Sequence, residues 1–143
     1  MKKGNLRITW GVLLLGLEQD WLTPSEVIEL VNKHSKKLTI DEGLLVHLNV
    51  NEDDKSIILE LLREKGESEK EEAINYWYYN ELLSIEQSDK PIRDKLKDIE
   101  LQWSKFDYPN EWREFIYYLP NEKSSSKEDI YQLFLNYLDS FRD

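Results

Sequence analysis

The chain contains few of the side chains that usually carry chemistry. It has 2 His and 0 Cys, which excludes thiol nucleophiles, disulfides and Cys-based metal sites. Neither His34 nor His47 has a nearby Ser, Asp or second His at a spacing typical of catalysis. Glycine-rich phosphate loops and the HExxH and GxSxG motifs are absent from the sequence. We therefore expect a protein that is not an enzyme and that binds no cofactor.

The carboxylates are numerous, and two runs of them are candidate metal ligands. Asp41-Glu42 and Glu52-Asp53-Asp54 lack the alternating ligands and the central glycine of a calcium loop. The spacing instead favours a solvated surface or helix capping. We expect no metal site.

Charge is the clearest compositional feature. The net charge is −10, from 29 acids and 19 bases. Residues 52–72 alone hold nine acids and four bases. Such a chain repels phosphate backbones, so we expect no direct binding of nucleic acid. A dense acidic surface instead speeds the encounter with a basic protein and selects for cationic patches. An ordinary solvated acidic surface has the same composition, and both interpretations stay open at this point.

A stripe of acids and aromatic rings is the predicted partner-binding surface. Glu69, Glu72, Tyr76 and Tyr79 are spaced by three and four residues, so they share one face of a helix. Exposed tyrosine gives a large contact area at a low entropy cost. The alternative is that Tyr76 and Tyr79 contact neighbouring helices.

Two further segments are candidates for an exposed binding surface. The acidic corner Glu52-Asp53-Asp54 is the second predicted partner-binding site, because it continues the negative charge. Tyr117 and Tyr118 are adjacent rings that cannot both face a core, as in the Tyr76–Tyr79 run.

Helix signals recur from end to end. A capping box is predicted at Thr23-Pro24-Ser25-Glu26, with Pro24 at the first helical position. The same spacing occurs at Ser68 with Glu71 and at Ser126 with Asp129. Further starts and stops are Asp53 or Asp54, Lys65-Gly66, and Asp89 with Pro91.

Apolar residues follow these starts at helical spacing. The three longest stripes are Ile74, Trp77, Tyr78, Leu82 and Ile85; Ile92, Leu96, Ile99, Trp103 and Phe106; and Ile130, Leu133, Phe134, Tyr137, Leu138 and Phe141. The alternation Leu44, Val46, Leu48 and Val50 resembles a strand, but a strand without a partner is unstable. A short buried helix is the simpler prediction there.

These patterns predict one all-α domain, residues 1–143, of six or seven packed helices. Residues 121–126 are predicted to form a polar loop. The basic start and the apolar run Ile8–Leu17 resemble a signal peptide, but no small-residue cleavage site follows. The run is also far shorter than the roughly 20 residues of a membrane helix. We expect a buried amphipathic first helix, no membrane association and a cytoplasmic protein.

One pair of segments resembles a known family. The segments Phe106-Asp107-Tyr108-Pro109 and Phe115–Pro120, with Trp112 between them, are similar to the signature of a family of short bacterial proteins of unknown biochemistry. The opening Trp10-Gly11 and Trp21-Leu22-Thr23-Pro24 also resembles that family. Ser104-Lys105 departs from the small or acidic pair expected before Phe106. The family includes immunity proteins encoded beside polymorphic toxins, notably LXG toxins with nuclease tips, and it offers no catalytic residues to carry over.

The resemblance implies a cytoplasmic immunity protein that binds a cognate toxin domain, a basic nuclease domain in our expectation. The first alternative is a structural or regulatory adaptor unrelated to toxins. The second is an enzyme with carboxylate chemistry, which 2 His, no Cys and no catalytic motif make a poor fit. The signature also has a folding interpretation. Tyr108 precedes Pro109 and is therefore expected in extended backbone that ends a helix, while Pro120 stops the next one. The oligomeric state is left open.

Overall fold

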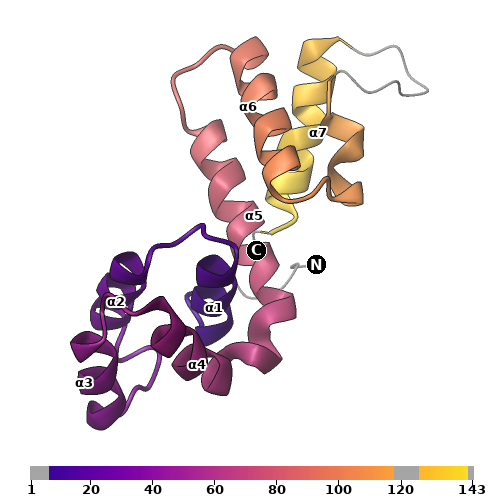
Figure 1. The fold of residues 1–143 in the computed structure, drawn as a ribbon. Helices are drawn as coiled ribbons and strands as arrows, with labels where there is room; N and C mark the ends of the chain where they lie inside the picture. The colour runs from indigo at the N-terminus through magenta and orange to yellow at the C-terminus, as the bar shows by residue number, and fades with distance from the viewer. Residues whose placement is uncertain (1–6, 118–125, 142–143) are drawn as a thin grey trace. The chain divides into compact units, whose positions relative to one another are not determined.

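The computed structural model describes residues 7–117 and 126–141. Tyr118, Pro120 and residues 121–125 of the predicted loop lie outside them. The described part is all-helical (Figure 1), which confirms the predicted fold class. Its elements are α1 (Trp10–Glu18), α2 (Pro24–Lys33), α3 (Glu42–Val50), α4 (Lys55–Gly66), the 3₁₀ helix η1 (Glu67–Glu69), α5 (Lys70–Glu86), α6 (Ile92–Lys105), the 3₁₀ helix η2 (Asn110–Phe115) and α7 (Lys127–Asp139).

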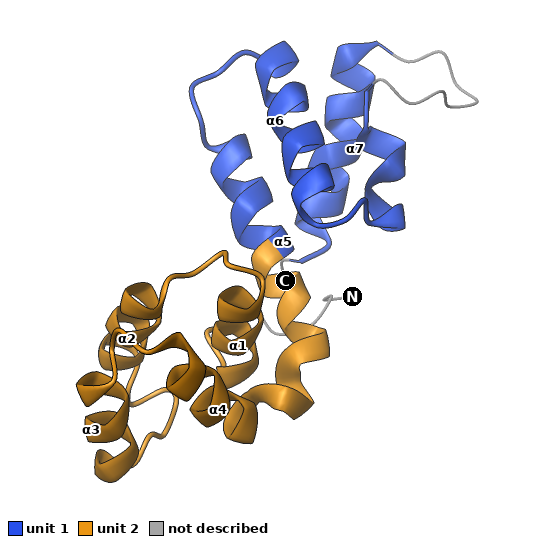
Figure 2. Ribbon diagram, in the orientation of Figure 1, with its two compact units in different colours: residues 1–3, 78–143 blue, residues 4–77 orange. Residues whose placement is uncertain are grey.

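The chain divides into two compact units (Figure 2). We call them the N-terminal unit, Gly4–Trp77, and the C-terminal unit, which contains Tyr78–Asp143. The boundary falls inside α5, so one continuous helix contributes residues to both units. The single domain stays a prediction.

The core of the N-terminal unit is built around α1. Val12, Leu13, Leu14 and Leu17 are all at most 1% exposed. The first helix is therefore buried as predicted, but it is apolar on nearly every side rather than amphipathic. The indole Nε1 of Trp77 donates to the carbonyl of Val12 at 3.2 Å, which ties the middle of α5 to α1.

Glycines allow the backbones of this unit to approach closely. A Cβ on Gly66 would lie 2.6 Å from the carbonyl oxygen of Trp10. Gly66 was predicted as a helix-ending glycine, and α4 does end there, but its φ is −112° rather than positive. Its role is therefore close contact, because no side chain fits between α4 and α1. The chain continues through η1, so Ser68 lies in η1 and does not cap α5 as predicted.

Side-chain caps start the first four helices. The Thr23 hydroxyl accepts from Glu26 N at 3.1 Å, and Thr23 N donates to the Glu26 carboxylate at 2.9 Å. This confirms the capping box, which satisfies two otherwise unpaired donors of α2. Thr9, Asp41 and Asp54 cap α1, α3 and α4 in the same position.

The segment with strand-like alternation is the helix α3, as predicted, but it is not buried. Leu48 is fully buried, whereas Val46 is 60% exposed and Val50 is 73% exposed. Because α3 presents one narrow face to α2, residues two positions apart point in different directions. The prediction of a buried helix was wrong for most of its length.

Aromatic rings form the core of the C-terminal unit. Trp112 and Phe115 of η2 are fully buried. The Trp112 ring lies edge-on to Tyr78 at 5.2 Å and to Phe106 at 5.7 Å between centroids. The predicted stripes on α5, α6 and α7 are confirmed as the buried faces, although Ile74, Ile92 and Leu133 are only half-buried.

The end of α6 differs from its prediction. Asp107 and Tyr108 have positive φ values of 63° and 57°, so Tyr108 is not extended. Tyr108 N donates to Trp103 O at 2.8 Å, and Asp107 N donates to Ser104 O at 3.1 Å. This is a Schellman motif, in which a left-handed residue lets two amides satisfy the last carbonyls of the helix. Pro109 then precedes η2, a 3₁₀ helix.

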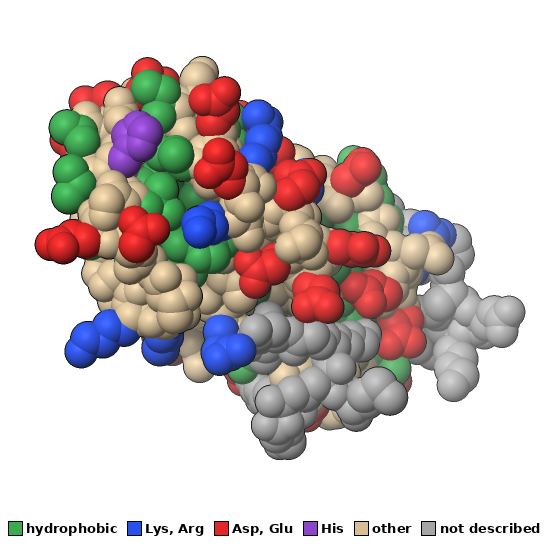
Figure 3. Space-filling model, turned by 90° about the horizontal axis from the view of Figure 1, so that it is seen from below, with side chains coloured by type: hydrophobic (Ala, Val, Ile, Leu, Met, Phe, Trp, Pro, Cys, Tyr) green, Lys and Arg blue, Asp and Glu red, His purple; other side chains and the backbone are tan. Residues whose placement is uncertain are grey.

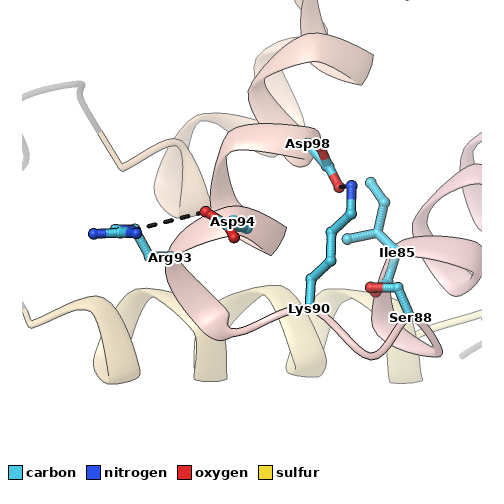
Figure 4. Close-up of polar contacts among 6 residues, drawn as sticks. All are labelled: Ile85, Ser88, Lys90, Arg93, Asp94 and Asp98. Carbon is cyan, nitrogen blue, oxygen red and sulfur yellow. Dashed lines mark hydrogen bonds and ion pairs between the residues drawn. The ribbon is translucent and has the colours of Figure 1, made fainter.

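The turn between α5 and α6 carries polar contacts (Figure 4). Lys90 Nζ lies 2.8 Å from Asp98 Oδ2, and the hydrogen bond to Asp98 raises the pKa of Lys90. The Ser88 hydroxyl donates to the carbonyl of Ile85 at 2.8 Å. Pro91, rather than Asp89, occupies the N-cap position of α6.

Candidate functional site

The predicted acidic corner lies in the turn between α3 and α4. Glu52, Asp53 and Asp54 are all exposed. The Asp54 carboxylate accepts a hydrogen bond from Ile57 N at 3.2 Å and so has a capping role. Asp53 and Asp54 line an open cleft of about 420 Å³, whose other lining residues are Val50, Asn51, Lys55 and Ser56. The corner therefore combines negative charge with one apolar side chain.

Three basic side chains of residues 52–72 form ion pairs with acids of the N-terminal unit. Lys55 Nζ lies 2.6 Å from Asp20 Oδ1. Lys70 and Arg63 lie 3.1 Å and 3.6 Å from the carboxylate of Glu18. The hydrogen bond to Glu18 is the largest cause of the raised pKa of Lys70. These bases are therefore engaged with acids of α1 and its C-terminal turn.

The predicted stripe is less accessible than its spacing indicated. Glu72 is exposed, but Glu69 is half-buried, and a Cβ on Gly11 would lie 2.6 Å from the Glu69 carbonyl. Glu69 also lines a cavity of about 210 Å³. The remaining lining residues are Arg7, Ile8, Thr9, Trp10, Lys37, Leu38 and Thr39. Glu69 thus belongs to the packing of η1 on α1 as much as to the surface.

Both tyrosines of the stripe are half-buried. The Tyr76 ring lies edge-on to Trp77, with centroids 5.9 Å apart, and burial raises the pKa of Tyr76. Tyr79 contacts Phe141 within the C-terminal unit at 5.7 Å. The contact at Tyr79 agrees with the alternative interpretation that it touches a neighbouring segment. Glu69, Glu72 and Tyr76 belong to the N-terminal unit and Tyr79 to the C-terminal unit, so we treat them separately.

The structure reveals surface residues that the sequence interpretation missed. Val46 and Val50 of α3 are among the exposed large hydrophobic residues of the described ranges. Their i, i+4 spacing is a signal of a shared helix face, whereas the sequence pattern predicts a buried helix for the whole segment. Val50 reaches the same cleft as Asp53 and Asp54. The acidic corner and the outer face of α3 are therefore continuous.

The described residues were also compared with the requirements of a metal site and of a membrane-spanning helix. Within residues 7–117 and 126–141, no group of three or more His, Asp or Glu side chains is placed to hold a metal ion. None of the helices described there is both long and apolar enough to cross a membrane.

Comparison with known proteins identifies the family. A family model described as "Uncharacterized protein conserved in bacteria (DUF2247)" matches residues 1–142, so the chain belongs to this bacterial family. No curated protein and no solved structure matches the chain significantly.

Proposed function

We propose that this protein is a non-enzymatic, cytoplasmic immunity protein that binds the toxic domain of a cognate bacterial polymorphic toxin and blocks it. A nuclease domain is the expected target, because a cleft that grips nucleic acid is cationic. An acidic protein can occupy such a cleft by presenting carboxylates where phosphates would bind. The resemblance of the Phe106–Pro120 region to the signature of a bacterial family that includes toxin-immunity proteins supports this proposal.

The observation that carries the proposal is the exposed acidic surface of the N-terminal unit. Glu52, Asp53, Glu71 and Glu72 are exposed there. Three of the four bases in residues 52–72, Lys55, Arg63 and Lys70, have acidic partners within 4 Å. Unbalanced surface charge of this kind steers a cationic partner and raises its association rate.

The test first establishes whether a gene beside this one encodes a basic toxin domain, and that domain is then the binding probe. A locus without such a gene contradicts the proposal. Asp53→Lys and Glu72→Lys reverse two exposed acids, and we expect association at low salt to slow by about tenfold. The salt dependence of the association rate should weaken at the same time. Protection of cells that express the toxin domain gives a second readout.

Glu114→Lys is the matched control, because Glu114 is an exposed acid of the C-terminal unit. It changes the net charge by the same amount per substitution without touching the proposed surface. Equal slowing by Glu114→Lys and by Asp53→Lys would show that only total charge matters. If the wild-type chain neither binds nor protects against the toxin domain, the immunity function is wrong and the adaptor role takes its place.

A further inference from the structure

The outer face of α3 presents an apolar ridge. Glu42, Val46 and Val50 follow one another at four-residue spacing and are all exposed. The two valines have exposed fractions of 60% and 73%. On a helix, side chains four residues apart are neighbours, so the valines form one continuous patch. Contiguous exposed apolar side chains, unlike singly scattered ones, are the material from which contact surfaces are built.

The ridge is bordered by carboxylates at both ends. Glu42 lies in the first turn of α3, and Val50 reaches the cleft of about 420 Å³ that Asp53 and Asp54 also line. Figure 3 shows hydrophobic side chains, a histidine and acidic side chains together on one face of the molecule. An apolar centre with a charged border has the anatomy of a protein–protein contact.

The ridge is held firmly in place. Leu48 is fully buried beneath it. The side-chain amides of Asn32 in α2 and Asn49 in α3 exchange two hydrogen bonds, at 3.0 Å and 3.1 Å. Asp41 caps α3 by accepting from Leu44 N at 2.7 Å. A surface that is already ordered loses less conformational entropy when a partner binds.

We propose that the Val46–Val50 ridge is the centre of the surface that docks the cationic toxin domain. The occupant we infer presents an apolar side chain between Lys or Arg residues, so that the apolar parts meet and the cations face Glu42 and Asp53. The negative charges of Glu42 and Asp53 favour a partner with positive charges over a neutral or acidic one. A second copy of this chain would place acids against acids, which like-charge repulsion opposes. This inference rests on the proposed immunity function and names its binding residues.

The deciding variant is Val46→Ser combined with Val50→Ser. Serine and valine have similar helix propensities, so α3 should keep its structure. We expect binding of the toxin domain against which the chain protects in the test above to weaken by at least tenfold, mainly through faster dissociation. Asp53→Asn should instead slow association, because it removes a border charge.

Leu101→Ser is the matched control. Leu101 is 68% exposed on α6 of the C-terminal unit, so its loss removes a similar apolar side chain away from the ridge. Circular dichroism and the unfolding midpoint of each variant should match those of the wild type. Sedimentation of the wild type alone measures self-association.

Each outcome decides a different point. Tenfold weakening by the double variant together with wild-type binding by Leu101→Ser supports the ridge. Unchanged affinity of a folded double variant overturns the ridge while leaving the immunity function intact. A wild-type dimer that the double variant dissociates overturns the inferred occupant. A wild-type chain that binds no toxin domain overturns the immunity function and this surface with it.

Discussion

Replacing Gly11 with alanine should destabilise the protein, although the same change usually stabilises a helix. Alanine has a higher helix propensity than glycine by about 1 kcal/mol. In this structure, however, a Cβ on Gly11 would lie 2.6 Å from both the carbonyl carbon and the oxygen of Glu69. These are backbone atoms, which cannot rotate away. Overpacking of a core costs about 1–3 kcal/mol, and a backbone clash belongs at the upper end. We expect a net loss of about 2 kcal/mol.

Gly43→Ala is the control, because Gly43 is an exposed helical glycine. A Cβ there meets only the Asp41 carboxylate, at the ordinary distance of 3.4 Å, so stability should rise by up to about 1 kcal/mol. Urea unfolding followed by circular dichroism and tryptophan fluorescence measures both variants. The reasoning fails if Gly11→Ala is as stable as the wild type, or if both substitutions shift the midpoint in the same direction.

Four further changes test the packing, the caps and the buried ring. Trp103 is 4% exposed, so Trp103→Ala should lower the free energy of unfolding by about 3–5 kcal/mol, measured by urea unfolding. Thr23→Ala removes the hydroxyl that accepts from Glu26 N and should cost about 1 kcal/mol in the same assay. Asp107→Gly should raise stability by about 1 kcal/mol, because glycine adopts a φ of 63° without steric cost. Burial, with the nearby Glu111 carboxylate, raises the pKa of Tyr137. The folded state therefore holds this proton more tightly than the unfolded chain does. The contribution of Tyr137 to the free energy of unfolding should be fully present below about pH 10 and be lost as the pH rises beyond that value. Absorbance titration should show Tyr137 ionising only with unfolding, and its ionisation near pH 10 in the folded protein would contradict this.

Much of the helical architecture could be predicted because its signals are local. The Thr23 capping box and the Asp54 cap need only residues within one turn, and they occur where the spacing predicted them. The stripe on α7 likewise marks the buried face, because a three- and four-residue period leaves one side apolar.

Features that depend on distant segments could not be predicted in the same way. Gly66 has the sequence position of a helix terminator, but its close approach to Trp10 depends on the packing of α4 against α1. The Schellman motif after α6 places Asp107 and Tyr108 in a left-handed conformation that the following proline did not indicate. Local propensity describes what a segment tolerates, and tertiary contacts select among those options.

The predicted binding stripe illustrates the same limit at the surface. Its spacing placed four residues on one helix face, but Glu69 is packed against α1 and Tyr79 against Phe141. Conversely, α3 has enough apolar residues for a buried helix, and only the position of α2 decides that Leu48 faces inward. Exposure depends on the neighbouring helix, which a period alone does not identify.

The residues that carry the family resemblance and those that carry the proposed docking surface have different physical roles. Phe106, Trp112 and Phe115 are buried in the C-terminal unit, where their rings specify packing and are not available to a partner. Val46 and Val50 are exposed in the N-terminal unit and lie outside that signature. A chain can change such exposed residues with little effect on stability, because surface substitutions typically cost less than about 0.5 kcal/mol. The two roles can therefore be tested separately in this chain, because substitutions on the α3 surface leave the buried rings of the signature in place.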